Sequence, residues 1–64
     1  MVGSRIDAVR KDRGLSIRAL ATKAQLSTSA LHRIVHNQQE ARASELARLA
    51  EALNVSVGDL YQAA

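Results

Sequence analysis

The stretch IRALATKAQLSTSALHRIVH, residues 17–36, decides how this chain folds. It contains two short runs of helix-favouring residues, separated by the three residues QLS. Ser16 and Ser27 each precede one run, where a serine hydroxyl caps a helix N-terminus. The apolar side chains recur at offsets that two steeply crossing helices bury, with Ala21 as the small residue where they touch: Leu20, Ala24, Leu26, Leu31 and Ile34. The stretch therefore predicts two short helices packed across a tight turn.

The second run, residues 28–36, has two different faces. At about 100° per residue, its apolar side chains Ala30, Leu31, Ile34 and Val35 fall within an arc of about 140°. The complementary arc holds only side chains that form hydrogen bonds: Thr28, Ser29, His32, Arg33 and His36. A core explains the apolar arc, whereas the polar arc requires a partner that offers hydrogen-bonding groups.

The remainder of the chain predicts three further helices. A first helix is expected over about residues 4–13, and Gly14 stands where a left-handed residue ends a helix with least strain. The segment SELARLAEALN, residues 44–54, has leucine and alanine at the i, i+3, i+4 and i+7 positions of one helix face. After Ser56 we expect a short last helix whose apolar side chains face the core: Val57, Leu60 and Tyr61. Five short helices leave no room for a strand, so we expect one all-α domain over residues 1–64, a compact five-helix bundle.

The composition narrows the class of protein. A chain of 64 residues is enough for one small domain. The absence of Cys excludes a disulfide-rich secreted scaffold and a thiolate metal site. No apolar run approaches the roughly 18 residues of a transmembrane helix, so we expect a soluble, cytoplasmic protein without membrane contact. The single aromatic residue, Tyr61, argues against the stacking platforms that hold single-stranded nucleic acid.

The charge is unevenly distributed along the chain. Residues 1–39 have an excess of five positive charges and residues 40–64 an excess of two negative charges, which together give the net charge of +3. A small basic protein that is polarised in this way typically meets a polyanion with its positive end.

Two phrases of the sequence resemble a known family. RGLSIRALATKAQLSTSALHRI, residues 13–34, and ELARLAEALNVSVGDL, residues 45–60, are similar to the phage repressor/Cro-type helix-turn-helix family of DNA-binding domains. The resemblance extends without insertion from about Arg5 to Tyr61. It implies a lambda repressor-like fold with a helix-turn-helix unit over about residues 16–36. It also implies sequence-specific binding of double-stranded DNA, with residues 28–36 as the recognition helix in the major groove of an operator, as in a transcriptional repressor or regulator.

The chain departs from the family pattern at four positions. Gln25 stands where the family commonly has Gly, which predicts either left-handed strain at the turn or a slightly different turn. Ile17 replaces a frequent Gln that reaches a phosphate, and Ala41 stands where a Pro often precedes the fourth helix. Val35 replaces a Glu that pairs with a basic residue of the first helix, so we expect Arg10 to be freer to face DNA.

Four side chains of residues 28–36 are expected to contact bases. The resemblance assigns base contacts to Thr28 and Ser29, at the N-terminus of the helix. Arg33 lies one turn further on the same side and can donate two hydrogen bonds to guanine O6 and N7. His32 lies between them and can contact a base or a phosphate.

Phosphate contacts are expected to fix the docking and to supply most of the affinity. The free N–H groups at the start of the second helix and the serine hydroxyl beside them are suited to a phosphate. The remaining candidates are basic side chains near the same surface. The full set comprises Arg10, Ser16, Ile17, Arg18, Lys23, His36 and Arg42.

Other functions are weighed against DNA binding. His32 and His36 have the i, i+4 spacing that can hold zinc, but the chain has neither a Cys nor a third His, so we expect no metal and no cofactor. A domain of this size has nowhere to bury an oriented catalytic triad, so we expect no enzyme and no catalytic residues. The alternatives that stay open are a protein–protein interaction module on this fold, such as an antitoxin-like or accessory subunit, and an engineered bundle.

A single recognition helix reads only a few base pairs, too few to select a site in a genome. Members of this fold commonly bind as two-fold dimers on half-sites about 10 base pairs apart. We therefore expect a homodimer on an operator with an inverted repeat. The free protein should be weakly dimeric or monomeric, since little apolar surface remains outside the core. The contact is expected to come from the loop after Asn37 and from the last helix, with Val57 and Tyr61 partly exposed for it.

Overall fold

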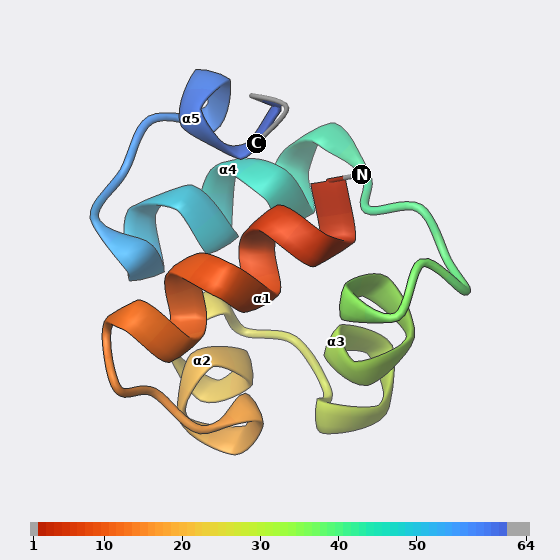
Figure 1. Cartoon of the computed structure of the whole chain (residues 1–64). Helices are drawn as coiled ribbons and strands as arrows, with labels where there is room; N and C mark the ends of the chain where they lie inside the picture. The colour runs from red at the N-terminus through yellow and green to blue at the C-terminus, as the bar shows by residue number, and fades with distance from the viewer. Residues whose placement is uncertain (1, 62–64) are drawn as a thin grey trace.

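The structure, a computed structural model, describes residues 2–61 and contains five helices and no strand within them. The helices are α1 (Val2–Asp12), α2 (Ile17–Ala24), α3 (Thr28–Val35), α4 (Ala43–Leu53) and α5 (Val57–Tyr61). In Figure 1, α1 runs across the middle of the molecule, with α2 and α3 below it and α4 and α5 above it. α2 packs on both α3 and α4, and α1 contacts α3, α4 and α5. The predicted all-α, five-helix architecture is confirmed.

The first four helices all end in the same way. Each is followed by a residue with a left-handed backbone: Gly14 (φ 68°), Gln25 (φ 58°), Asn37 (φ 59°) and Asn54 (φ 60°). The next N–H then donates to a carbonyl five residues back: Leu15 to Arg10 (3.1 Å), Leu26 to Ala21 (2.8 Å), Gln38 to Arg33 (2.8 Å) and Val55 to Ala50 (3.0 Å). This pattern satisfies carbonyl groups that a helix end leaves unpaired. The left-handed conformation predicted for Gln25 is confirmed.

Side chains from all five helices meet in one aliphatic core. The largest side chains that are fully buried come from α1, α2, α3, α4 and α5: Ile6, Leu20, Leu31, Leu49, Leu53 and Leu60. No polar or charged side chain of residues 2–61 is buried. The positions predicted to be buried where α2 meets α3 are buried, except that Leu26 is half-buried. Burial of these apolar groups holds together helices that are too short to be stable alone.

The structure corrects several predicted boundaries and orientations. α1 begins two residues before Ser4 and ends at Asp12, and α3 ends at Val35, with His36 as its C-cap. In α5 only Leu60 faces the core, because Val57 is 36% exposed and Tyr61 is 60% exposed. The expectation that all three side chains face the core is therefore wrong for Val57 and Tyr61, whereas the expectation that these two are partly exposed is confirmed.

Gly3 brings α1 into close contact with the end of α3. A Cβ atom on this residue would overlap the Ile34 carbonyl oxygen and would lie 2.6 Å from Asn37 Oδ1. Gly3 is buried, and on the next residue the Ser4 hydroxyl accepts a hydrogen bond from Asn37 Nδ2 (3.3 Å). The absence of a side chain at Gly3 therefore sets the distance between α1 and α3.

Gly3→Ala should destabilise the fold by about 1–3 kcal/mol, because the added methyl group meets backbone that cannot move without shifting α3. Gly58→Ala is the matched control, since a Cβ there meets only Ser56 Oγ at 3.7 Å. The control should leave stability unchanged or raise it by up to about 1 kcal/mol, as expected for Gly to Ala in a helix. Urea denaturation followed by circular dichroism measures both. Equal stability of the two variants would contradict the close packing of α1 on α3.

Candidate nucleic-acid interface

α2 and α3 form a rigid pair joined by a three-residue turn. Ser16 and Ser27 cap the two helices, as predicted: their hydroxyls accept hydrogen bonds from the N–H groups of Ala19 and Ala30, both at 3.0 Å. The chain turns at Gln25, and the buried faces of the two helices then pack against each other. The orientation of α3 is thus fixed by both its start and its buried face.

The outward face of α3 carries the five polar side chains that the helical wheel separated from the core. Leu31, Ile34 and Val35 are buried, and Ala30 is half-buried. The exposed residues are Thr28, Ser29, His32, Arg33 and His36. The predicted division of this helix into an apolar and a polar arc is confirmed, and we call these five residues the polar arc.

Two contacts order side chains within the polar arc. The rings of His32 and His36 lie in contact one turn apart, with their centroids 4.3 Å apart and their planes tilted by 56°. Arg33 Nε donates a hydrogen bond to Gln39 Oε1 at 2.9 Å. Sequence reasoning did not identify Gln39, because the two residues are six positions apart across a helix end and no periodicity links them.

The N-terminus of α2 is a second polar feature of the helix pair formed by α2 and α3. The first bond inside the helix is made by the Leu20 N–H to the Ser16 carbonyl at 3.0 Å, so the N–H groups of Ile17 and Arg18 precede the helical hydrogen bonds. Two N–H groups at a helix N-terminus are suited to an anion. The Ile17 side chain is half-buried and packs against the core, whereas Ser16 and Arg18 are exposed.

Arg10 is not free, contrary to the expectation drawn from Val35. Its Nη2 and Nε atoms lie 2.8 and 2.9 Å from Asp7 Oδ1, and its Nη1 donates to the Leu15 carbonyl at 2.7 Å. The Arg10 side chain is only 14% exposed. Asp7 on α1 thus takes the place of the expected partner on α3, and a contact of Arg10 with phosphate stays a prediction that requires this pair to open.

The same carboxylate contacts a second cation. Asp7 Oδ2 lies 3.3 Å from Lys11 Nζ. Burial raises the pKa of Asp7, but the hydrogen bonds and positive charges of Arg10 and Lys11 outweigh it and hold the pKa below its ordinary value of 3.8.

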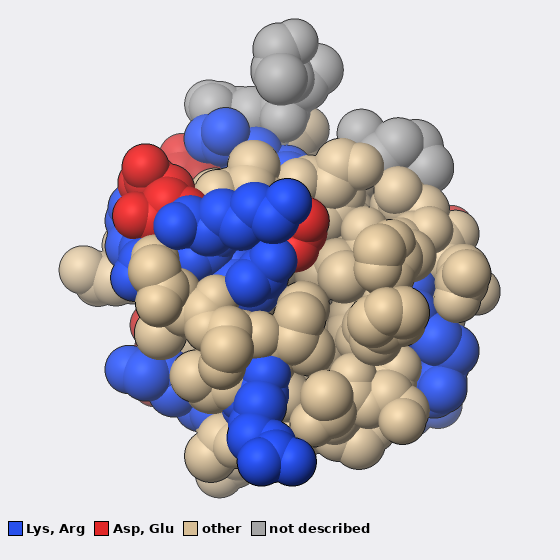
Figure 2. Space-filling view, turned by 60° about the horizontal axis from the view of Figure 1, so that its bottom comes forward, with Lys and Arg blue, Asp and Glu red and all other residues tan. Residues whose placement is uncertain are grey.

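The remaining predicted phosphate ligands lie at the surface. Lys23 in the last turn of α2 and Arg42, which precedes α4, are exposed. Figure 2 looks toward the end of the molecule that carries α2 and α3. Basic side chains lie at several places around a broad uncharged surface there, and most of the visible acidic groups lie at one side beside basic ones.

Three other arginines are used inside the fold. Arg13 Nε donates to the Leu53 carbonyl (3.2 Å), Arg48 Nε to the Ala24 carbonyl (2.9 Å) and Arg5 Nε to the Asp59 carbonyl (3.2 Å). Leu53 and Ala24 are the last residues of α4 and α2, where carbonyl groups carry partial negative charge. Arg13 and Arg48 therefore hold the C-terminal ends of α4 and α2, and Arg5 joins α1 to α5.

Two kinds of feature are absent from the part of the chain that the structure describes. Among residues 2–61, no three His, Asp or Glu side chains gather where they could hold a metal ion. Within the same residues, no helix combines the length and the apolar character that crossing a membrane needs.

Residues 5–63 match the sequence family described as the Cro/C1-type HTH DNA-binding domain. SinR of Bacillus subtilis, the master regulator for biofilm formation, has been solved in complex with DNA and has a TM-score of 0.91 to this chain at 36% identity. The match covers 97% of this chain and 100% of the SinR chain. The restriction-modification controller protein C.AhdI from Aeromonas hydrophila has a TM-score of 0.92 at 27% identity, over 94% of this chain and 91% of C.AhdI.

A further match extends beyond this chain. The clp gene regulator ClgR from Corynebacterium glutamicum has a TM-score of 0.89 at 29% identity, and the match covers 92% of this chain but 63% of the ClgR chain. No curated protein sequence matches the chain.

Asp7→Asn should lower stability by about 0.3–1 kcal/mol near pH 7, since it removes a partly exposed ion pair. Because the pKa of Asp7 is lowered in the folded state, the pair stabilises fully well above pH 3.8 and less as the pH falls toward the folded-state pKa. The difference in melting temperature between wild type and variant should therefore close below about pH 4. Asp12→Asn is the control, because Asp12 is 75% exposed and pairs only with the adjacent Arg13 among the described residues. A difference that is the same at pH 7 and pH 3 would contradict the ion pair.

Proposed function

Because the chain belongs to the Cro/C1-type HTH DNA-binding domains, it is a DNA-binding regulatory domain, and we propose that its polar arc reads a specific duplex sequence in the major groove. The observation that carries this proposal is the exposed arc of Thr, Ser, His and Arg on a helix whose other face is locked into the core. An α-helix fits the major groove, where base edges offer hydrogen-bond donors and acceptors. An arc for docking a protein would instead be apolar or acidic.

The base contacts are assigned by position along α3. Thr28 and Ser29 lie in its first turn, the part of a recognition helix that points at base edges. Arg33 follows one turn later and presents a guanidinium that can donate two hydrogen bonds to guanine. His32 lies between them, with its ring in tilted contact with that of His36. We assign base contacts to Thr28, Ser29, His32 and Arg33.

The phosphate contacts surround this helix. The first N–H groups of α2, at Ile17 and Arg18, bind one phosphate with the Ser16 hydroxyl beside them. Three exposed side chains bind phosphates on either side of the groove: Lys23 in the last turn of α2, His36 at the end of α3 and Arg42 before α4. Arg10 joins them only when DNA competes successfully with Asp7.

Two copies act together on an operator. The exposed large apolar side chains of the described residues are Val57 and Tyr61, both on α5, which is too little surface for a strong dimer in the absence of DNA. The domain is therefore monomeric or weakly dimeric when free and pairs on an inverted repeat through α5 and the loop that follows Asn37. It acts in the cytoplasm, on chromosomal DNA.

Selection of bound duplexes from a random pool tests the function and returns the operator. On the selected duplex, Arg33→Ala should weaken binding by about 1–3 kcal/mol and abolish the preference at one base pair, a guanine in our assignment. Arg42→Ala is the control for a phosphate contact. It should weaken binding to selected and random duplexes alike and should lower the magnitude of the salt slope by about one. An equal loss on both duplexes for Arg33→Ala would remove Arg33 from the base contacts. If no sequence is enriched, sequence-specific binding itself is wrong.

The dimer has its own test. Selected sites should be inverted repeats with half-sites about 10 base pairs apart, and binding curves should have Hill slopes above one. Analytical ultracentrifugation should find two protomers on the full repeat and one on a duplex with one half-site destroyed. Tyr61→Ala should lower the Hill slope while leaving binding to the single half-site unchanged. One protomer on every selected duplex would exclude the dimer.

A further inference from the structure

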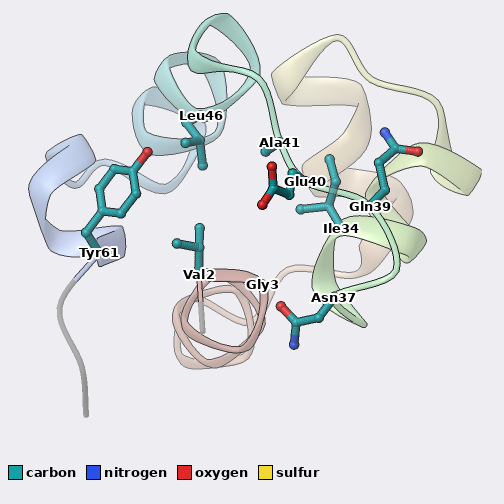
Figure 3. Close-up of a pocket in the computed structure, with 9 residues that line it drawn as sticks. All are labelled: Val2, Gly3, Ile34, Asn37, Gln39, Glu40, Ala41, Leu46 and Tyr61. Atoms are coloured by element: carbon teal, nitrogen blue, oxygen red, sulfur yellow. The ribbon is translucent and has the colours of Figure 1, made fainter.

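Among residues 2–61, Gln39 is the one residue of the loop between α3 and α4 whose side chain forms a hydrogen bond with the polar arc. Its Oε1 accepts a hydrogen bond from Arg33 Nε at 2.9 Å. Arg33 is exposed and Gln39 is half-buried, so the contact joins an exposed side chain to a less exposed one. Figure 3 shows Gln39 at one edge of a hollow of about 490 Å³ that is lined by α1, the end of α3, the loop, the start of α4 and Tyr61 of α5.

The backbone around Gln39 is held by the end of α3. Asn37 adopts the left-handed conformation, and its N–H donates to the Ile34 carbonyl at 3.1 Å. The Gln38 N–H then donates to the carbonyl of Arg33 itself at 2.8 Å. The Asn37 side chain is in turn anchored on Ser4 of α1. Gln39 therefore follows a turn with a defined geometry and returns to Arg33 from a fixed direction.

The contact uses the one guanidinium nitrogen that an end-on contact with guanine leaves free. Arg has five N–H donors, of which Nε carries one and the two terminal nitrogens carry four. When Nε–H is bound to Gln39, both terminal nitrogens remain available for the O6 and N7 atoms of one guanine. A glutamine accepts this bond without charge, so Arg33 keeps its full positive charge for DNA.

We propose that Gln39 is a positioning residue for base recognition: it holds the Arg33 guanidinium before DNA binds, with its two terminal nitrogens directed outward. Arginine has one of the largest side-chain entropies, and fixing the side chain in advance removes part of that cost from the binding step. The effect concerns the choice of base more than the total affinity, because phosphate contacts do not depend on the orientation of Arg33. The inference rests on the proposed reading of DNA by α3.

The test compares Gln39→Ala with wild type on two duplexes, the selected operator and the same operator with the base pair read by Arg33 exchanged. The discrimination ratio is the Kd on the exchanged duplex divided by the Kd on the selected operator. This ratio should fall by about three- to tenfold in Gln39→Ala, which is part of what the loss of a bidentate contact costs. Gln38→Ala is the matched control, because Gln38 is exposed and reaches Arg33 through its backbone N–H. It should leave the ratio unchanged. Gln39→Glu keeps the acceptor and should preserve the ratio, while its negative charge weakens binding to both duplexes.

A second measurement separates positioning from a structural role. In the Arg33→Ala background, Gln39→Ala should cause no further change in the ratio, since the effect acts through Arg33. In the free protein, exchange of the Arg33 Nε proton with water, followed by NMR, should be faster in Gln39→Ala than in Gln38→Ala, and this readout needs no DNA. If the wild type selects a sequence but Gln39→Ala and Gln38→Ala have equal ratios, the positioning role is wrong and the reading of DNA stands. Equal exchange rates in the two variants would also overturn it. Failure of the wild type to select any sequence, in contrast, overturns the proposed function itself.

Discussion

An eight-residue helix is too short to hold its shape in water, and α3 has only eight residues. Burial of Leu31, Ile34 and Val35 supplies what the helix itself lacks. That burial needs α2 on one side and the closely approaching Gly3 of α1 on the other. Binding by the polar arc depends on this packing of α3 between α2 and α1, because the packing holds the backbone that carries the five hydrogen-bonding side chains.

The distribution of the arginines shows why the net charge of the chain does not locate its binding surface. Of the arginines in residues 2–61, four donate to backbone carbonyls: Arg5, Arg10, Arg13 and Arg48. The exposed ones near α2 and α3 are fewer: Arg18, Arg33 and Arg42. The basic composition thus serves two purposes, donating hydrogen bonds to backbone carbonyls within the fold and meeting an anionic partner. Four of the seven arginines in residues 2–61 therefore make hydrogen bonds within the fold.

The fold could be predicted from the sequence to the extent that local rules act alone. Serine caps, left-handed helix ends and apolar spacing depend on residues close in sequence, so Ser16, Ser27 and Gln25 behave as expected. The predictions fail where the partner of a side chain is distant in sequence or where two partners compete for it. Arg10 pairs with Asp7, and this pairing depends on side-chain geometry that no periodicity encodes. The contact of Gln39 could not be predicted, because its hydrogen bond with Arg33 forms only when the loop folds back over α3.

Tyr61 has a consequence for how this domain can be observed. It is the chain's single aromatic residue, with neither Trp nor Phe beside it in the composition, and it lies 60% exposed on α5. Its surroundings are already largely aqueous in the folded state, so its intrinsic fluorescence should change little when the aliphatic core melts. The same signal should respond when another molecule covers α5. The domain therefore carries a built-in optical reporter of contacts at this surface, and its unfolding has to be followed through the backbone instead.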